Sequence, residues 1–478
     1  MPRRTPLFLA LDQGGHASRA RVFDAGGKLV AAAEKRIATR HPAAHRVEHD
    51  PNALLASVRQ ACRSVARQLG PRVADIRRAG LATQRSTVVC WDRNTGHALS
   101  PVISWQDRRA ARYIQTLAPH AARVHRITGL VLSAHYGASK LRWCLKKLRA
   151  VRRAWQQQRL AAGPLAGFIL ANLLVEKPLL ADPVNASRTL LWDYRARTWS
   201  PELLALFGIG AEILPECVPN QHAFGHVLLA KRKIPLTVVT GDQPAALFAQ
   251  GPPRTDSIYI NLGTGAFIQR LHGSQPPRVA GLLGSVLWQD AERALYVLEG
   301  TVNGAASALA WLRRQLGISE KLMLKNMPGW LDSESGVPLF LNGISGLGSP
   351  YWQADFRSRF VGHADRGKKF LAVIESIVFL LCVNLEKMRT RQAPLRRIVV
   401  TGGLANRHEI CQSLADLSGL RVIRPEEREA TARGVAVLLG MRGLSETRHG
   451  VVWRPQINSP LRQRYARWQA EMRLALSR

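Results

Sequence analysis

Short apolar runs bounded by glycine open the chain. Residues 7–11 are apolar and residues 20–23 are apolar except for Arg21, and the polar segment Asp12-Gln13-Gly14-Gly15 follows the first of these runs. A third run begins at Leu29, after a turn at residues 24–27. Runs of this length between glycine-rich turns are typical of β-strands, so the pattern predicts three consecutive strands. The first turn either presents backbone N–H groups to a phosphate or is a plain flexible hairpin, and these residues alone leave both interpretations open.

The middle of the chain repeats this arrangement. Ser257–Leu262 and residues 267–271 are mostly apolar, strand-like segments on either side of Gly263-Thr264-Gly265, and Asn261 takes the place that Asp12 has in the first hairpin. Two similar hairpins, one opening each half, predict two related domains that face each other across a nucleotide cleft. Segments of helical spacing are expected at Pro51–Leu69 and at residues 305–316, 368–388 and 404–417.

A second acidic residue follows an apolar run near the centre of the chain. The run ends in Gly241-Asp242-Gln243, and Pro244 then opens a segment that can start a helix. This order places a carboxylate at the C-terminal edge of a sheet, where α/β proteins bind ligands. A turn with a solvated acid is the alternative. The step Gly402-Gly403 likewise either lets a nucleotide approach the backbone or is ordinary punctuation between strand and helix.

Two further segments place polar side chains within or beside apolar runs. Thr83-Gln84-Arg85 interrupts residues 80–92, which are predicted to form a buried strand pair. A buried arginine requires an anionic or hydroxylated partner. Trp105 precedes Gln106-Asp107, and an indole beside hydrogen-bonding groups suits a polyol pocket. A core tryptophan flanked by helix-capping residues is the alternative interpretation.

The composition is typical of a folded protein with two domains. The chain has 478 residues, of which 46% are hydrophobic and 21% are charged. No apolar run approaches the roughly 20 residues required to span a bilayer, and the first run is too short for a signal peptide. The six cysteines show no CxxC spacing, which argues against a zinc site or a disulfide framework. A cytoplasmic protein that does not act at a membrane is therefore expected.

The chain is strongly basic, with a formal net charge of +35. Such a charge can indicate a nucleic acid, a membrane surface or an anionic substrate as partner. The basic residues are spread along the chain, however, and no RNA-binding aromatic motif or zinc-finger spacing accompanies them. In the densest cluster, residues 140–153, apolar residues alternate with cations at helical spacing, which predicts a solvated helix face. No specific nucleic-acid partner is expected.

Taken in order, these segments resemble the FGGY family of carbohydrate kinases, and its glycerol kinase branch most. The similarity extends from about residue 8 to residue 440. It implies an α/β protein with two actin-like ATPase (ribonuclease H-like) domains that close over ATP and a polyol. The implied boundaries are residues 1–250 for the acceptor side, 251–445 for the nucleotide side and 446–478 for a basic tail. The motifs that carry the resemblance are Leu11-Asp12-Gln13-Gly14, Thr83-Gln84-Arg85, Ser104-Trp105-Gln106-Asp107-Arg108-Arg109, Thr128-Gly129-Leu130, Asn185-Ala186-Ser187-Arg188-Thr189, Gly241-Asp242-Gln243, Gly263-Thr264-Gly265, Leu298-Glu299-Gly300, residues 346–352, Glu375-Ser376-Ile377, Gly402-Gly403 and Arg424-Pro425-Glu426.

The resemblance also implies the cofactors ATP and Mg²⁺, a small polyol or sugar as acceptor, and a homo-oligomeric assembly, either a dimer or a tetramer. It makes Asp242 the general base and Asp12 the Mg²⁺ ligand, while Arg19 reaches the transferred phosphate. The implied acceptor pocket contains Arg85, Ser86, Trp105, His135, Asp242, Gln243 and Phe267, and the implied nucleotide contacts are Asp12, Gly14, Gly15, Arg19, Gly263, Thr264, Gly265, Gly402 and Gly403.

Several positions depart from the pattern that is usual in glycerol kinases. Gly15-His16 stands in place of two threonines, Ser86 in place of a glutamate and His135 in place of a tyrosine, and on the nucleotide side Ala306 and Ala310 replace a glycine and a glutamine. A site built to hydrogen-bond a polyol loses affinity when a buried partner disappears. Three hypotheses follow: a glycerol kinase-like enzyme, a kinase for another acceptor such as a pentulose, and a degenerate homologue that acts as a nucleotide- or sugar-binding regulatory protein.

Overall fold

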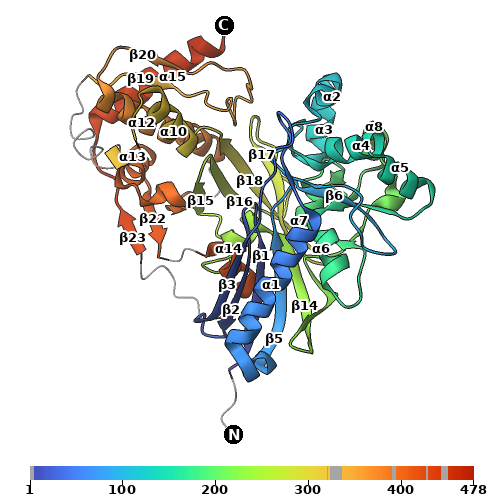
Figure 1. Ribbon diagram of the computed structural model, residues 1–478. Coiled ribbons are helices and arrows are strands. Elements are labelled where there is room, and N and C mark those ends of the chain that lie inside the picture. Colours follow the sequence, from blue (N-terminus) through green and yellow to red (C-terminus); the bar gives the residue numbers. More distant parts are fainter. Residues whose placement is uncertain are drawn as a thin grey trace.

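The protein has two halves, each built around a mixed β-sheet (Figure 1). The computed structural model describes residues 5–319, 321–322, 336–389, 394–426, 429–442 and 450–477. In the first half, the six-stranded sheet has the order β13-β14-β5-β1-β2-β3. Its strands are β1 (Leu7–Gln13), β2 (Ala17–Asp24), β3 (Leu29–Arg36), β5 (Ile76–Thr83), β13 (Gln221–Leu229) and β14 (Arg232–Gly241).

The register of this sheet brings the ends of three parallel strands together. β1 and β14 both pair in parallel with β5, and Asp12 and Thr240 lie opposite Ala82 from its two sides. The C-terminal ends of parallel strands meet at one edge of a sheet, which is where α/β proteins bind ligands. Polar residues that end or follow β1, β5 and β14 therefore gather at this edge.

Helices cover both faces of the first sheet. Leu9 of β1 packs with α1 (Pro51–Leu69) on one face, whereas Phe8 points to the other face and packs with α14 (Ala430–Leu438). Helix α14 comes from the far end of the sequence, and Figure 1 shows it against β1 in the middle of the molecule. The second half of the chain thus completes the core of the first.

Residues that lie in the sequence mostly between β5 and β13 form a smaller layer. It contains a sheet of order β4-β7-β6-β8. The expected strand pair within residues 80–92 is wrong, because β5 and β6 belong to different sheets and Ser86, with a φ of 61°, turns the chain between them. The elements of this layer are β4 (Glu48–His49), β6 (Val88–Asp92), β7 (Val102–Ile103), β8 (Leu160–Pro164), β9 (Leu180–Ala181), β10 (Trp192–Asp193), β11 (Thr198–Trp199), β12 (Glu216–Cys217), α2 (Ala111–Thr116), α3 (Ala121–Thr128), α4 (Gly137–Lys147), α5 (Arg149–Gln156), α6 (Leu165–Leu173), α7 (Pro183–Ser187) and α8 (Pro201–Phe207).

The basic run at residues 140–153 forms α4 and α5. Lys146 and Lys147 are exposed, as expected for a solvated helix face. Lys140 differs from them because its side chain is fully buried. The sequence pattern does not distinguish this lysine from its neighbours, because the burial of Lys140 depends on which face of α4 meets the core.

The seven-stranded sheet of the second half repeats the plan of the first. Its order is β17-β18-β16-β15-β21-β22-β23, with an antiparallel hairpin at β15 and β16 and with β21 and β22 parallel to β15. The predicted relation between the two halves is thereby confirmed. The strands are β15 (Ser257–Leu262), β16 (Ala266–Gly273), β17 (Leu283–Gln289), β18 (Ala294–Val302), β21 (Arg397–Thr401), β22 (Arg421–Pro425) and β23 (Gly450–Trp453). β19 (Leu339–Leu341) and β20 (Arg359–Val361) form a separate two-stranded sheet, and the helices are α10 (Ala306–Gln315), α12 (Arg366–Met388), α13 (His408–Ser418) and α15 (Ser459–Leu476).

The end of the chain is part of the second core. β23 pairs with β22, and α15 places the fully buried Trp468 against Phe379 of α12. The range 446–478, expected as a basic tail, therefore includes a strand and a helix, and the expected boundary at residue 445 lies outside the described residues. Among the helices that the structure describes, none is long and apolar enough to cross a membrane.

Candidate active site

Two carboxylates meet at the C-terminal edge of the first sheet. Asp12 lies near the end of β1, and Asp242 is the first residue of α9 (Asp242–Leu247), directly after β14. Burial and then the negative charge of Asp242 raise the pKa of Asp12 to about 7, although Arg19 opposes this shift. Burial also raises the pKa of Asp242, against the positive charge of Arg85. Asp12 is thus poised to titrate near neutral pH, and a nearby cation would favour the ionised forms of both carboxyl groups.

Helix α14 fixes the position of α9 and therefore of Asp242. A side chain at Gly434 would overlap the carbonyl oxygen of Ala245, so the two helices approach to backbone contact only because this residue is glycine. The hydroxyl of Thr431 also donates to the carbonyl oxygen of Asp242 at 3.3 Å. A segment of the second half therefore orients the acid of the first.

The hairpin between β1 and β2 presents its backbone beside these acids. The Gly14 N–H donates to the carbonyl of Ala17 at 3.0 Å, which closes the turn. Arg19 of β2 donates to Asp12 at 3.3 Å and to Glu34 at 2.9 Å. At Gly15, an added Cβ atom would lie 3.8 Å from the Gln84 side-chain oxygen and 3.9 Å from the Trp105 indole nitrogen, so the turn lies next to both side chains.

Arg85 joins the two halves of the chain. Its guanidinium donates to Glu299 of β18 at 3.1 Å and to the side-chain oxygen of Gln243 at 2.5 Å. Glu299 also accepts from Arg188 at 2.8 Å and from Gln269 at 2.7 Å. The two guanidinium groups outweigh burial and lower the pKa of Glu299 to about 2. The anionic partner that a buried arginine requires is therefore present, and it comes from the second half.

Trp105 and His135 form a second wall near Arg85. Their rings meet edge to face with centroids 5.6 Å apart, and His135 makes a similar contact with Tyr136 at 5.0 Å. Burial and then the charge of Arg108 lower the pKa of His135 well below its usual value. This imidazole is neutral at physiological pH, so it offers hydrogen bonds without a charge.

Ser86, adjacent to Arg85, contributes no hydrogen bond from its side chain. Its buried hydroxyl has no partner among the described residues. Phe267 comes from the second half, on β16, where it lies opposite Thr301 of β18 and is half-buried. The hydrogen-bonding groups of the expected acceptor pocket come from the first half together with Glu299.

A cavity of about 560 Å³ lies beside these groups on the second half. Gly402, with a φ of 91°, lies so close to β15 that a Cβ atom would be 2.5 Å from the Leu262 carbonyl oxygen, while Gly403 has open space on its free side. Gly263, Thr264 and Gly265 form the β15–β16 turn, and the Thr264 carbonyl accepts the N–H groups of Ala305 and Ser307 at the start of α10. The cavity lining includes Asn261, Thr401, Gly402, Gly403, Ala405, Asn406, Arg424, Pro425, Ala430 and Thr431.

Several of the expected residues therefore lie close together, and two that were not assigned a role join them. Contacts and mutual electrostatic effects link Asp12, Arg19, Arg85, His135, Gln243 and Asp242 at one edge. Arg188 and Glu299 were noted only as parts of motifs; an acid that ends the apolar run 295–298 is the signal that marks Glu299. Within the described ranges, no group of three or more His, Cys, Asp or Glu side chains is arranged to hold a metal.

Comparison with family models matches both halves of the chain. Residues 7–249 match the N-terminal domain, and residues 258–442 the C-terminal domain, of the FGGY family of carbohydrate kinases. Glycerol kinase of Rhodopirellula baltica is 34% identical over 456 residues, which cover 92% of this chain and 84% of that protein. Glycerol kinase of Trichlorobacter lovleyi is 36% identical over 451 residues, covering 91% of this chain and 90% of that protein.

Solved structures show the same fold. Plasmodium falciparum glycerol kinase with ADP superimposes with a TM-score of 0.87 at 22% identity, over 99% of this chain and 98% of that one. Xylulose kinase of Rhodospirillum rubrum gives a TM-score of 0.84 at 18% identity, over 99% and 100% of the two chains. The expected α/β architecture with two related domains is thus confirmed.

Proposed function

The chain belongs to the FGGY family of carbohydrate kinases, and from that premise we propose that it transfers the γ-phosphoryl group of Mg-ATP to a hydroxyl of a small polyol or sugar, with Asp242 as general base. The observation that supports this role is the position of Asp242. It lies at the edge of the first sheet, beside the Arg85–Gln243 pair and within the electrostatic reach of Asp12.

Phosphoryl transfer asks little covalent chemistry of the protein, so positioning and charge neutralisation carry most of the catalysis. Asp242 takes the proton of the acceptor hydroxyl. At the same time the hydroxyl oxygen bonds to the γ-phosphorus and the bond between this phosphorus and ADP breaks. Its raised pKa makes Asp242 a better base than an ordinary aspartate. Arg85 and Gln243 provide hydrogen-bonding groups for the hydroxyls of the acceptor.

The residues present fit a nucleotide and a magnesium ion. The cavity beside Gly402 and Gly403 exposes backbone of the kind that phosphates and nucleosides approach closely. Asp12 offers oxygen ligands, and burial together with Asp242 disfavours its ionised form, which a divalent cation would favour. When bound, Mg²⁺ would neutralise phosphate charge, and Mg²⁺ needs only one or two carboxylates in addition to phosphates and water.

The acceptor is proposed only as a class. The relatives named above are glycerol kinases, whereas this chain has Ser86 and His135 where the resemblance implies a glutamate and a tyrosine. The Ser86 hydroxyl is buried and has no hydrogen-bond partner in the described part of the chain. A polyol or a pentulose that forms hydrogen bonds with uncharged side chains is compatible with these two residues.

The test is release of ADP from Mg-ATP with glycerol, dihydroxyacetone, erythritol, xylulose or ribulose, measured with a coupled assay. We expect turnover with at least one acceptor, and a loss of about a hundredfold or more in Asp242→Asn. Asp355→Asn is the matched control, because this aspartate is exposed.

If no acceptor stimulates turnover although ATP binds, the proposal is wrong and the degenerate binding protein is favoured. The homo-oligomer that the family resemblance implies is also a proposal, and light scattering of the purified protein tests it. A monomeric mass would contradict it.

A further inference from the structure

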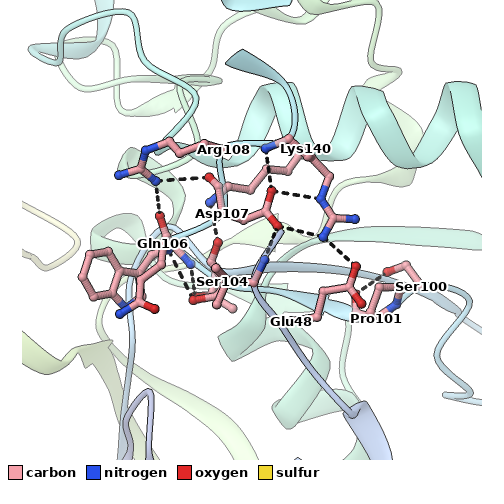
Figure 2. Close-up of polar contacts among 12 residues, drawn as sticks. Glu48, Ser100, Pro101, Ser104, Gln106, Asp107, Arg108 and Lys140 are labelled. Carbon is pink, nitrogen blue, oxygen red and sulfur yellow. Dashed lines mark hydrogen bonds and ion pairs between the residues drawn. The ribbon is translucent and has the colours of Figure 1, made fainter. Parts of the chain in front are cut away.

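A single buried lysine touches three separate segments of the first half. Lys140 lies on α4 and its side chain is fully buried. Its ammonium group donates to the carbonyl oxygens of Ser86 at 3.0 Å, Ser104 at 2.8 Å and His135 at 2.7 Å. Figure 2 shows Lys140 in the same cluster as Ser104, Asp107 and Arg108.

The three acceptors match the donors of a charged lysine. An ammonium has three N–H groups and no lone pair, so each proton is directed to one carbonyl. In the described part of the chain no ion pair joins Lys140 to a carboxylate, because the nearby Asp107 is occupied by Arg109 and by the Val47 N–H. Burial and the charge of Arg108 lower the pKa of Lys140, whereas the three carbonyl dipoles favour its charged form.

The three carbonyls belong to the segments that form the expected acceptor pocket. Ser86 follows Arg85, Ser104 precedes Trp105, and His135 carries the ring that meets the Trp105 indole. These residues come from the turn between β5 and β6, the turn after β7 and the loop before α4. β6 and β7 pair through Val88 and Ile103, whereas the His135 loop belongs to no strand. One nitrogen atom thus connects the His135 loop to the two segments that the pairing of β6 and β7 holds together.

Other bonds attach two of these segments to the core without Lys140. The Ser104 N–H donates to Val47, the Trp105 N–H donates to the Thr87 hydroxyl, and Arg109 binds both Asp107 and Glu48. The Ser86 turn continues directly from β5. The Ser86 and Ser104 segments are therefore held together without the lysine, and what the lysine adds is a backbone link between them and the His135 loop.

We propose that Lys140 is a positioning residue for the acceptor, which acts by holding the His135 loop against the Ser86 and Trp105 segments while never touching the acceptor itself. This inference rests on the proposed function. It follows that loss of the ammonium group makes the acceptor site larger or less ordered, whereas the nucleotide side, formed by the second half, does not change.

The test compares Lys140→Met, which has a similar length but no N–H donor, with Lys147→Met on the exposed side of the same helix. For Lys140→Met we expect the KM of the acceptor to rise about tenfold or more, with the KM of ATP within about twofold of the parent. Lys147→Met should match the parent in both. Lys140→Arg keeps the charge but spreads its donors over three nitrogens, so it should also raise the acceptor KM.

The outcomes separate this inference from the proposed function. If the parent protein turns over an acceptor and Lys140→Met keeps the parent KM for it, the role of Lys140 is wrong and the kinase stands. An equal rise in the KM of ATP and of the acceptor, or a failure of both Lys140 variants to fold, means a general structural role and overturns the inference. If the parent binds an acceptor without turnover, calorimetric Kd values replace KM, and if it does neither, both proposals are wrong.

Discussion

Arg85 and Glu299 form a buried ion pair across the two halves of the chain, with Nη1 and Oε1 3.1 Å apart. Their side chains are 5% and 2% exposed, and Arg188 binds the other oxygen of the same carboxylate at 2.8 Å. The pair connects the turn after β5 with β18, so the relative position of the two sheets and the position of Arg85 beside Asp242 are coupled.

Replacement of Glu299 by glutamine should destabilise the protein strongly. Removal of this carboxylate leaves two buried guanidinium groups without their anion, which typically costs about 3 kcal/mol of unfolding free energy. Urea unfolding of Glu299→Gln measures the loss, with the exposed Glu292→Gln as control. Equal stability of the two variants would show that the interdomain pair contributes nothing net.

The same carboxylate predicts a loss of stability in acid. Glu299 has a pKa of about 2 in the folded protein against an ordinary value of 4.5, so its contribution is present above about pH 4.5 and is lost as the pH falls towards 2. The stability difference between the parent and Glu299→Gln should therefore shrink over that interval. A difference that stays constant between pH 5 and pH 3 would contradict the paired state of Glu299.

For Asp12 we expect the opposite dependence of stability on pH. Its pKa is raised from 3.8 to about 7, so in the absence of ligands its contribution to stability falls as the pH rises from about 4 to 7. Asp12→Asn should thus be more stable than the parent at pH 8, by on the order of 2 kcal/mol, and similar to it near pH 4. Denaturant unfolding at both pH values tests this, with Asp355→Asn as control, and a destabilised variant at pH 8 would refute it.

Gly402→Ala should disturb the nucleotide side. The residue has a φ of 91°, and an added Cβ would be 2.5 Å from the Leu262 carbonyl oxygen, so β15 or the turn must move. We expect a loss of about 2 kcal/mol in stability and weaker ADP binding, measured by unfolding and by calorimetry. Gly403→Ala, which meets no atom within 4 Å, should keep the parent stability, and equal stability of both variants would contradict the steric argument.

Trp468→Ala tests the contribution of the last helix. The indole is fully buried against Phe379, and its N–H donates to the Phe340 carbonyl at 2.9 Å. Removal should lower the unfolding free energy by about 3 kcal/mol or more, whereas Leu474→Ala, at a residue that is 56% exposed, should have little effect. A small effect of Trp468→Ala would mean that residues 459–476 form a dispensable addition.

Local patterns in the sequence were sufficient for the repeated plan of the fold. Runs of apolar residues with period two or 3.6, interrupted by glycine, identify the two hairpins and the main helices, because the period of a buried face is a local property of the chain. The same patterns place Asp12 and Asp242 after strands. The motif order adds the family, and with it the expected positions of Arg85, Trp105 and Gly402.

The pairing of distant residues depends on the folded chain. The need of Arg85 for an anion was visible in the sequence, but its partner Glu299 lies 214 positions away, and Lys140 was expected on a solvated helix face although its ammonium binds three buried carbonyls. α14 likewise completes the core of the first half from the far end of the chain. Contacts of this kind depend on how sheets and helices pack in space, and no local periodicity encodes them, whereas strands and helices follow from the apolar pattern of the residues that form them.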